Sequence, residues 1–108
     1  MENIVLVLVR DLLFTSKITG EAKSLDIPVK LIRDPAQLAA EEGGRLIVDL
    51  NQPGALDAAI QWKSSHPGKV IGFVSHVDGA TIERAQRGGI DQILARSQFV
   101  QHLPELLK

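Results

Sequence analysis

The sequence alternates between two hydrophobic periods, and this alternation limits the folds that the chain can adopt. Short apolar runs rich in β-branched residues, typical of buried strands, recur at regular intervals along the 108 residues. The runs lie at 4–9, 29–32, 46–50, 70–75 and 92–95. Between them, apolar residues are spaced three or four positions apart, as on one face of a helix. The pattern therefore predicts five strand–helix units.

The expected helices differ in how clearly the sequence marks their ends. They are centred on 14–25, 36–42, 55–65, 78–88 and 99–107. For the second, Asp34 is a suitable cap, Pro35 suits the first helical position, and the glycine pair at 43–44 predicts a left-handed turn at its end. Pro104 interrupts the last segment because proline has no N–H to donate, so we expect a short, broken fifth helix.

Strict alternation of strand and helix with short links implies right-handed crossovers and a parallel sheet that is covered on both faces. Five such units predict a flavodoxin-like, doubly wound α/β fold with strand order 2-1-3-4-5. The length fits one domain over 1–108, and we expect no separate output domain. In such sheets, functional residues lie past the carboxyl ends of the strands.

Composition excludes several classes of protein. Twelve Lys and Arg against thirteen Asp and Glu give a net charge of -1, with no basic block of the kind that nucleic-acid binding needs. The longest apolar run has only six residues, at 4–9, which is too short for a membrane span. The absence of cysteine excludes disulfides and thiolate chemistry. We therefore expect a cytoplasmic protein that contacts neither membranes nor nucleic acid.

Charged and hydroxyl residues follow four of the five predicted strands. Arg10 and Asp11 follow the first strand, Asp49 ends the third, Ser75 ends the fourth and Arg96 follows the fifth. Carboxylates are ligands for hard cations, and hydroxyl and basic groups stabilise phosphoryl oxygens. The joint pattern indicates a small cation or phosphoryl site at the carboxyl edge of the sheet.

Two stretches of the chain resemble the receiver domain of two-component response regulators. The segment 46–54, Leu-Ile-Val-Asp-Leu-Asn-Gln-Pro-Gly, is similar to the phosphoacceptor segment of that family. The segment 85–91, Ala-Gln-Arg-Gly-Gly-Ile-Asp, is similar to the family's Ala-x-x-x-Gly-Ala-Asp pattern at the end of the fourth helix. The resemblance covers essentially the whole chain and implies a role in phosphorelay signal transduction.

The resemblance implies roles for individual residues. Asp49 falls on the phosphoacceptor, Asp11 on the second acid of the magnesium-binding pair, and Ser75 on the hydroxyl that contacts the phosphoryl group. Two positions depart from the family pattern. Arg10 stands where the family has its first acid, and Arg96 stands where it has a nearly invariant lysine. These replacements change the formal charge of the site from -2 to zero.

The added cations oppose metal binding. A charge pair at ~5 Å interacts by roughly 3 kcal/mol at an effective dielectric of ~20, so a cation in place of an anion beside a divalent ion costs on the order of 10 kcal/mol before relaxation. We expect Arg10 to bridge Asp49 and Asp11 in place of magnesium, with an Arg10 side chain that extends into solvent as the equal alternative. The family's aromatic switch position on the fifth strand holds Ile93, which we expect to pack in the core and so to cut the usual conformational relay.

The leading functional hypothesis is a stand-alone, atypical receiver-like domain that acts through protein–protein interaction. It is not expected to be an enzyme, to need a cofactor, or to be phosphorylated efficiently at Asp49. The partner is a histidine kinase, another regulator, or a second copy of the chain. The family's interaction face corresponds here to Arg84, Arg87, Phe99 and Gln101. Phe99 would anchor an interface if it is left partly exposed, but core packing is the favoured interpretation for this residue.

Two other functions remain open on the sequence. One is a conventional receiver in which Asp49 accepts a phosphoryl group from a histidine kinase, with magnesium held by Asp11 and Asp49. The other is an anion or small-ligand binding module in which Arg10 and Arg96 hold a carboxylate or phosphate.

Overall fold

The computed structural model describes residues 4–74 and 78–108, and its core is a five-stranded sheet of order β2-β1-β3-β4-β5. Every neighbouring pair of strands is parallel. The strands are β1 (Val5–Leu8), β2 (Val29–Leu31), β3 (Arg45–Asp49), β4 (Lys69–Val74) and β5 (Gln92–Ala95). The sequence-based prediction of a flavodoxin-like parallel sheet in the order 2-1-3-4-5 is confirmed.

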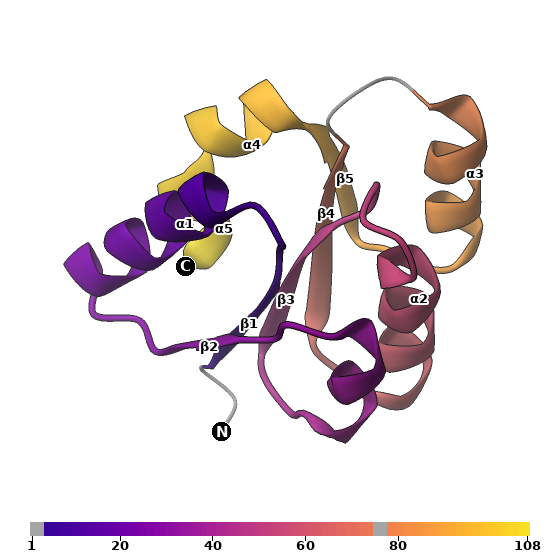
Figure 1. The fold of residues 1–108 in the computed structure, drawn as a ribbon, viewed down its shortest axis with the longest axis horizontal. Coiled ribbons are helices and arrows are strands. Elements are labelled where there is room, and N and C mark those ends of the chain that lie inside the picture. The colour runs from indigo at the N-terminus through magenta and orange to yellow at the C-terminus, as the bar shows by residue number, and fades with distance from the viewer. Residues whose placement is uncertain (1–3, 75–77) are drawn as a thin grey trace.

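Helices cover both faces of the sheet, as Figure 1 shows. The elements are α1 (Leu12–Ser24), the 3₁₀ helix η1 (Pro35–Ala40), α2 (Ala55–Ser65), α3 (Gly79–Arg87), α4 (Arg96–Gln101) and α5 (Leu103–Leu107). In Figure 1, α1, α4 and α5 lie on one side of the sheet, and α2 and α3 lie on the other. Within the described part of the chain, no helix combines the length and apolar character that a membrane span requires.

Strand alternation divides the core into two clusters. Val5 and Val7 of β1 pack with α1, α4 and α5, whereas Leu6 and Leu8 of the same strand pack with η1, α2 and α3. Successive residues of a strand point to opposite faces, and a parallel sheet is buried on both. The face on which a residue lies is therefore fixed by its position along the strand, and this rule also decides which charged residues meet at the end of the sheet.

The second helix begins as predicted but ends differently. Asp34 Oδ1 accepts a hydrogen bond from the Ala36 N–H at 3.0 Å, and Pro35 occupies the first turn of η1. The predicted left-handed turn at Gly43–Gly44 is wrong, since the positive-φ glycines of the described chain are Gly54 and Gly89. Gly43 serves a close approach instead, because a Cβ there would lie 2.8 Å from the Ile4 carbonyl oxygen. Close contact with the first strand explains the glycine at this position.

The last helical segment is split, as the proline predicted. α4 follows β5 directly, and Pro104 lies in the first turn of α5. Backbone N–H groups in the first turn have no partner within the helix, so a proline there costs no hydrogen bond. The Ala95 N–H donates to Gln98 Oε1 at 3.2 Å, which fixes the junction between β5 and α4. This junction places Arg96 at the first position of α4 and turns Phe99 toward the sheet.

Phe99 is fully buried, so the core packing that the sequence favoured is confirmed, and Phe99 does not contribute an exposed anchor to the predicted interaction face. Its ring lies 5.5 Å from the ring of Phe14 and 4.9 Å from that of Phe73, centroid to centroid. Such aromatic contacts add stability beyond their buried area. The three rings hold α1 and α4 against β4.

Replacing Phe99 with alanine should therefore destabilise the fold. We expect Phe99→Ala to lower the free energy of unfolding by about 3–5 kcal/mol, because it leaves a cavity among the aromatic rings. Gln101→Ala, on the exposed side of the same helix, is the matched control and should change it by less than about 0.5 kcal/mol. Urea unfolding followed by circular dichroism measures both. Equal effects of the two substitutions would contradict this account of α4.

Candidate functional site

The carboxyl edge of the sheet brings together the acidic residues that the sequence singled out. Asp49 is the last residue of β3, and Asp11 is the N-cap of α1 immediately after the central strand β1. Arg96 opens α4 directly after β5. Ser75, the predicted hydroxyl contact, lies outside the described residues.

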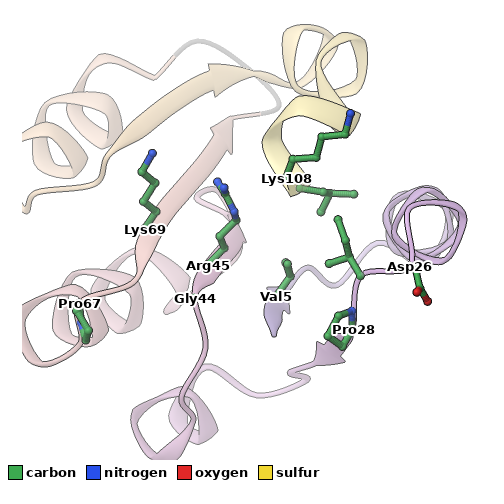
Figure 2. A pocket seen from close by; sticks show the side chains of 10 residues that line it. Val5, Asp26, Pro28, Gly44, Arg45, Pro67, Lys69 and Lys108 are labelled. Atoms are coloured by element: carbon green, nitrogen blue, oxygen red, sulfur yellow. The ribbon is translucent and has the colours of Figure 1, made fainter. Parts of the chain in front are cut away.

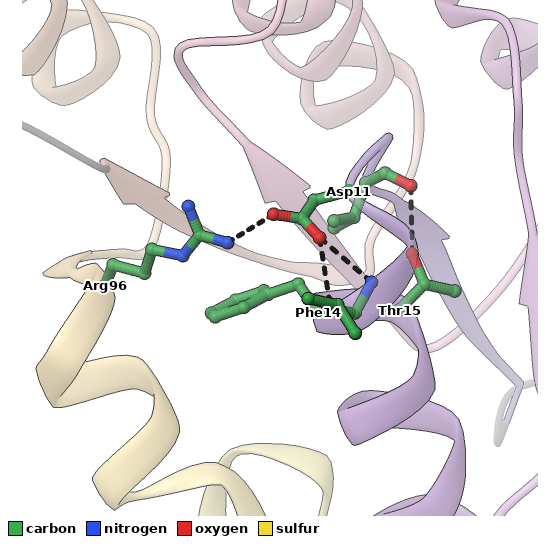
Figure 3. A network of polar contacts seen from close by, with 6 residues as sticks. Asp11, Phe14, Thr15 and Arg96 are labelled. Carbon is green, nitrogen blue, oxygen red and sulfur yellow. Dashed lines mark hydrogen bonds and ion pairs between the residues drawn. The ribbon is translucent and has the colours of Figure 1, made fainter.

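Asp11 holds the start of α1 with one of its carboxylate oxygens. Asp11 Oδ1 accepts hydrogen bonds from the Leu13 N–H at 2.9 Å and the Phe14 N–H at 3.2 Å (Figure 3). These N–H groups have no partner within the helix, so a capping carboxylate is worth about 1 kcal/mol at such a position in general. The cap fixes the direction in which the second carboxylate oxygen points.

The second oxygen of Asp11 binds Arg96. Arg96 Nη2 donates to Asp11 Oδ2 at 2.6 Å, and the guanidinium carbon lies 4.3 Å from the centroid of the Phe14 ring. Figure 3 shows the guanidinium reaching from α4 to the first turn of α1. The two side chains are 38% and 39% exposed. An ion pair and a cation–π contact thus hold Arg96 at the carboxyl edge.

The contacts of Asp11 favour its ionised form. The hydrogen bond from Arg96 is the largest cause, followed by the Phe14 N–H, and together they hold the pKa of Asp11 below its usual range. Hydrogen bonds to the charged form of a carboxyl lower its pKa in this way. Asp11 is therefore an anion whose partner is already present in the fold.

Asp49 is half-buried at the end of β3 and accepts a hydrogen bond from the Asn51 N–H at 3.0 Å through Oδ1. Its side chain lies on the same face of β3 as those of Arg45 and Ile47, and Ile47 packs in the cluster beneath α1 and α4. Asp49 thus lies on the same face of the sheet as Asp11. The placement agrees with the sequence prediction that both acids gather at this edge.

Of the two placements considered for Arg10, the bridge to Asp49 and Asp11 is wrong and the solvent-exposed side chain is confirmed. Arg10 is exposed, forms no ion pair with any of the described residues, and lines a small hollow of about 70 Å³ beside Leu31 and Arg33. Arg10 lies beyond the last residue of β1, and the hollow that it lines is shared with Leu12 and Thr15 of α1. Arg96 makes the predicted contact with Asp11 in its place.

This arrangement also bears on the other ligands that the sequence left open. Arg10 lies on the β2 side and Arg96 is bound over Phe14, so the two arginines do not converge on one anion as the ligand-binding alternative requires. Both oxygens of Asp11 have partners, and the described residues contain no group of three metal-ligating side chains. As arranged, these side chains do not fit a divalent cation.

The predicted interaction face is only partly available. Arg84 is exposed and pairs with Asp57 of α2, and Arg87 pairs with Glu83 one turn earlier at 3.4 Å. Ile93 is partly buried against the cluster beneath α2 and α3, as the sequence indicated. Gln101 is exposed. The side chains that this face exposes to solvent are thus polar and belong to α3 and α4.

Sequence reasoning missed two residues of the site. Phe14 supplies the ring beneath Arg96, although its spacing from Asp11 on one helix face was a usable signal. Gln52 lies in the segment that resembles a phosphoacceptor loop, and it is 8% exposed with an Oε1 that accepts no hydrogen bond from the described residues. Nothing in its local pattern distinguished Gln52 from a solvated loop residue.

The fold and edge described above define an α/β protein of the doubly wound parallel class, with acids at the carboxyl ends of its central strands. Comparison with solved structures narrows this class to the receiver fold. A response regulator of Burkholderia pseudomallei, crystallised with a phosphorylated aspartic acid, a calcium ion and citrate, matches with a TM-score of 0.81 at 18% identity, over 99% of this chain and 67% of its own. The chain therefore has the fold of response regulator receiver domains.

Other solved receivers agree. A response regulator of Thermotoga maritima matches with a TM-score of 0.76 at 15% identity, over 97% of this chain and 93% of its own. A CheY-like receiver domain of Methanospirillum hungatei matches with a TM-score of 0.81 at 12% identity, over 99% and 94%. No family model and no curated protein matches the sequence. At these identities the likeness concerns the fold.

The Asp11–Arg96 pair predicts an acid-dependent loss of stability. A carboxyl whose pKa is lowered in the folded state stabilises the fold above its unfolded pKa and loses this effect as the pH falls through the folded value. Arg96→Gln removes the largest cause of the lowered pKa of Asp11. We expect wild type to be more stable than Arg96→Gln at pH 7, and the difference to shrink as the pH falls from about 5 to 2.

Urea unfolding at a series of pH values measures this difference. Arg33→Gln is the charge-matched control, because Arg33 is exposed and forms no ion pair with a described residue. Its difference from wild type should stay flat over the same range. A gap between wild type and Arg96→Gln that does not depend on pH would contradict the role assigned to this pair.

Proposed function

We propose that the protein is an atypical receiver-like signalling domain that acts through protein contacts and is poorly or not phosphorylated at Asp49. The observation that carries this proposal is the bond from Arg96 to Asp11, with the guanidinium packed over Phe14. The receiver resemblance of the sequence and the receiver fold supply the signalling class. The contacts at the carboxyl edge distinguish this chain from a conventional receiver.

The contacts that Arg96 already makes argue against efficient phosphorylation of Asp49. In the family that the sequence resembles, a lysine at this position contacts the phosphoryl group. A phosphoryl group on Asp49 would draw Arg96 away from two partners that it already has, Asp11 and the Phe14 ring. Arginine stays charged at all relevant pH values, so the contact is not released by deprotonation. The phosphorylated state therefore gains less from Arg96 than it would from an uncommitted lysine.

The metal requirement gives a second reason. Magnesium takes oxygen ligands in near-octahedral geometry and is bound by carboxylates. Here Arg10 replaces one acid of the expected pair, and both oxygens of Asp11 accept hydrogen bonds. We propose that the Asp11–Arg96 pair supplies the charge balance that a metal supplies in other receivers. The domain would then hold one conformation without a phosphoryl signal.

The proposed output is contact with another signalling protein. The candidates are those predicted from the sequence: a histidine kinase, another regulator, or a second copy of this chain. Arg84 and Arg87 of α3 and Gln101 of α4 offer exposed polar groups for such a contact. Ile93 in place of an aromatic residue removes the ring whose rotation would link Asp49 to that face. A constitutive interaction module without catalytic activity agrees with these features.

A conventional phospho-receiver is the second candidate. Asp49 favours it, because this carboxylate lies half-buried at the end of β3 within a segment that resembles the family's phosphoacceptor loop. The response regulator of Burkholderia pseudomallei carries a phosphorylated aspartic acid. The two candidates differ in whether Asp49 accepts a phosphoryl group while Arg10 and Arg96 are present.

Intact mass after incubation with acetyl phosphate and magnesium separates the two candidates. In this reaction an Asp49 carboxylate oxygen would form a bond to phosphorus, and acetate would leave. We expect wild type to gain no adduct. The double variant Arg10→Asp with Arg96→Lys restores the residues of the family pattern and should gain one phosphoryl group. Adding Asp49→Asn to the double variant should abolish the adduct.

The outcomes discriminate between the proposals. An adduct on wild type that Asp49→Asn removes would overturn the leading proposal and establish the phospho-receiver. If wild type gains no adduct, the single variants Arg10→Asp and Arg96→Lys show which of the two arginines suppresses the reaction. Because Arg96 forms an ion pair with Asp11 and Arg10 does not, we expect Arg96→Lys to restore more of the reaction than a neutral substitution of Arg10, Arg10→Gln.

A further inference from the structure

A second concave surface lies at the opposite, amino-terminal edge of the sheet. Its volume is about 420 Å³, within the range typical of small-molecule sites. Its lining comes from the start of β1, β3 and β4, the loop before β2, and the end of α5. The residues are Val5, Asp26, Ile27, Pro28, Gly44, Arg45, Pro67, Lys69, Leu107 and Lys108. None of them belongs to the carboxyl-edge site.

Two cations stand side by side at the floor of this pocket. Arg45 and Lys69 are register partners on the adjacent parallel strands β3 and β4. Figure 2 shows both side chains extending in the same direction from their strands. Lys108, at the end of α5, adds a third cation at the rim. Like charges opposite one another in a sheet are destabilising unless an anion lies between them.

No described acid forms an ion pair with Arg45 or Lys69, although Asp91 interacts electrostatically with Lys69 at longer range. Five other cations of the chain bind acids, but Arg45, Lys69 and Lys108 form no ion pair within residues 4–74 and 78–108. Asp26 is the acid among the lining residues, and Figure 2 shows its carboxylate turned away from Arg45 and Lys69. Asp91, near Lys69, already accepts from Lys63 at 2.9 Å and from the Val70 N–H at 2.7 Å.

The walls of the pocket suit a ligand that is more than a bare ion. Ile27, Pro28 and Leu107 provide apolar surface beside the cations. Arginine binds phosphate oxygens through two parallel N–H groups, and a neighbouring lysine adds a point charge. Two adjacent cations match a group with two negative charges better than they match a single carboxylate. Charged and apolar parts of one small molecule would thus both be accommodated.

We propose that this pocket binds a small organic phosphate, with its phosphoryl oxygens on Arg45 and Lys69 and its apolar part against Ile27 and Pro28. The site is independent of the function proposed for the carboxyl edge, because it shares no residue with Asp11, Asp49 or Arg96. It gives the domain a ligand input at the end of the sheet remote from the phosphoacceptor position.

Isothermal titration calorimetry with ATP and with pyrophosphate, at constant ionic strength and without metal, tests the proposal. We expect both probes to bind wild type, and ATP to bind more tightly because it also carries an apolar base. Lys69→Gln and Arg45→Gln should each weaken binding about tenfold or more, since each removes a charge-assisted hydrogen bond. Lys17→Gln, on the exposed side of α1, is the charge-matched control and should bind as wild type does.

Amide chemical shifts locate the ligand in the same samples. We expect ATP to shift the amides of Gly44, Lys69 and Leu107, and to leave those of Asp11 and Asp49 in place. Lys69 is exposed, so loss of binding in Lys69→Gln with an unchanged spectrum elsewhere reports the site and not unfolding. Absence of binding, shifts confined to the carboxyl edge, or equal affinity for citrate would each overturn the proposal.

Discussion

The carboxylate of Asp11 makes two contacts on which the carboxyl edge of this fold depends. One oxygen caps α1 through the Leu13 and Phe14 N–H groups, and the other binds Arg96 of α4. The cap fixes the orientation of the carboxylate, and the orientation selects Arg96 as its partner. Arg96 in turn covers the Phe14 ring, which packs on Phe73 and Phe99. A polar contact at the edge and an aromatic cluster in the core thus stabilise the same junction of α1, α4 and β4.

The period of two along each strand decides which charges share that junction. Asp49 lies in the column of Ile47, on the face that packs against α1 and α4, and Asp11 caps the helix on that face. Arg10 lies beyond the last residue of β1, is exposed beside Leu12 of α1 and Leu31 of β2, and forms no ion pair with a described residue. Arg10 and Asp11, adjacent in the sequence, thus do not share a partner, whereas Asp11 and Arg96, 85 residues apart, are in contact.

The same reasoning explains what could be predicted from the sequence. Strand order and helix positions follow from hydrophobic periods, which are local, and from the handedness of crossovers, which is general. The end of η1 was not predictable in this way, because Gly43 is required by a contact with the distant Ile4 carbonyl. The location of Asp11, Asp49 and Arg96 at the carboxyl edge was predictable. Whether Arg10 or Arg96 binds Asp11 was not, because this depends on the direction of each side chain, and motif spacing does not give that direction. Phe99 was ambiguous for a similar reason, since the burial of a residue on a short helix depends on the angle at which that helix leaves the sheet.

The two ends of the sheet differ in how their charge is balanced. At the carboxyl edge, Asp11 and Arg96 neutralise each other, so an incoming metal or phosphoryl group must replace a contact that already exists. At the amino edge, strand register holds Arg45 and Lys69 side by side, and neither forms an ion pair with a described acid, although Asp91 interacts electrostatically with Lys69 at longer range. Replacing an existing partner opposes binding, whereas relieving repulsion between like charges favours it. On these electrostatic grounds, the amino edge of the sheet favours anion binding more than the carboxyl edge does. The carboxyl edge is the one that holds Asp49, the position that resembles a phosphoacceptor.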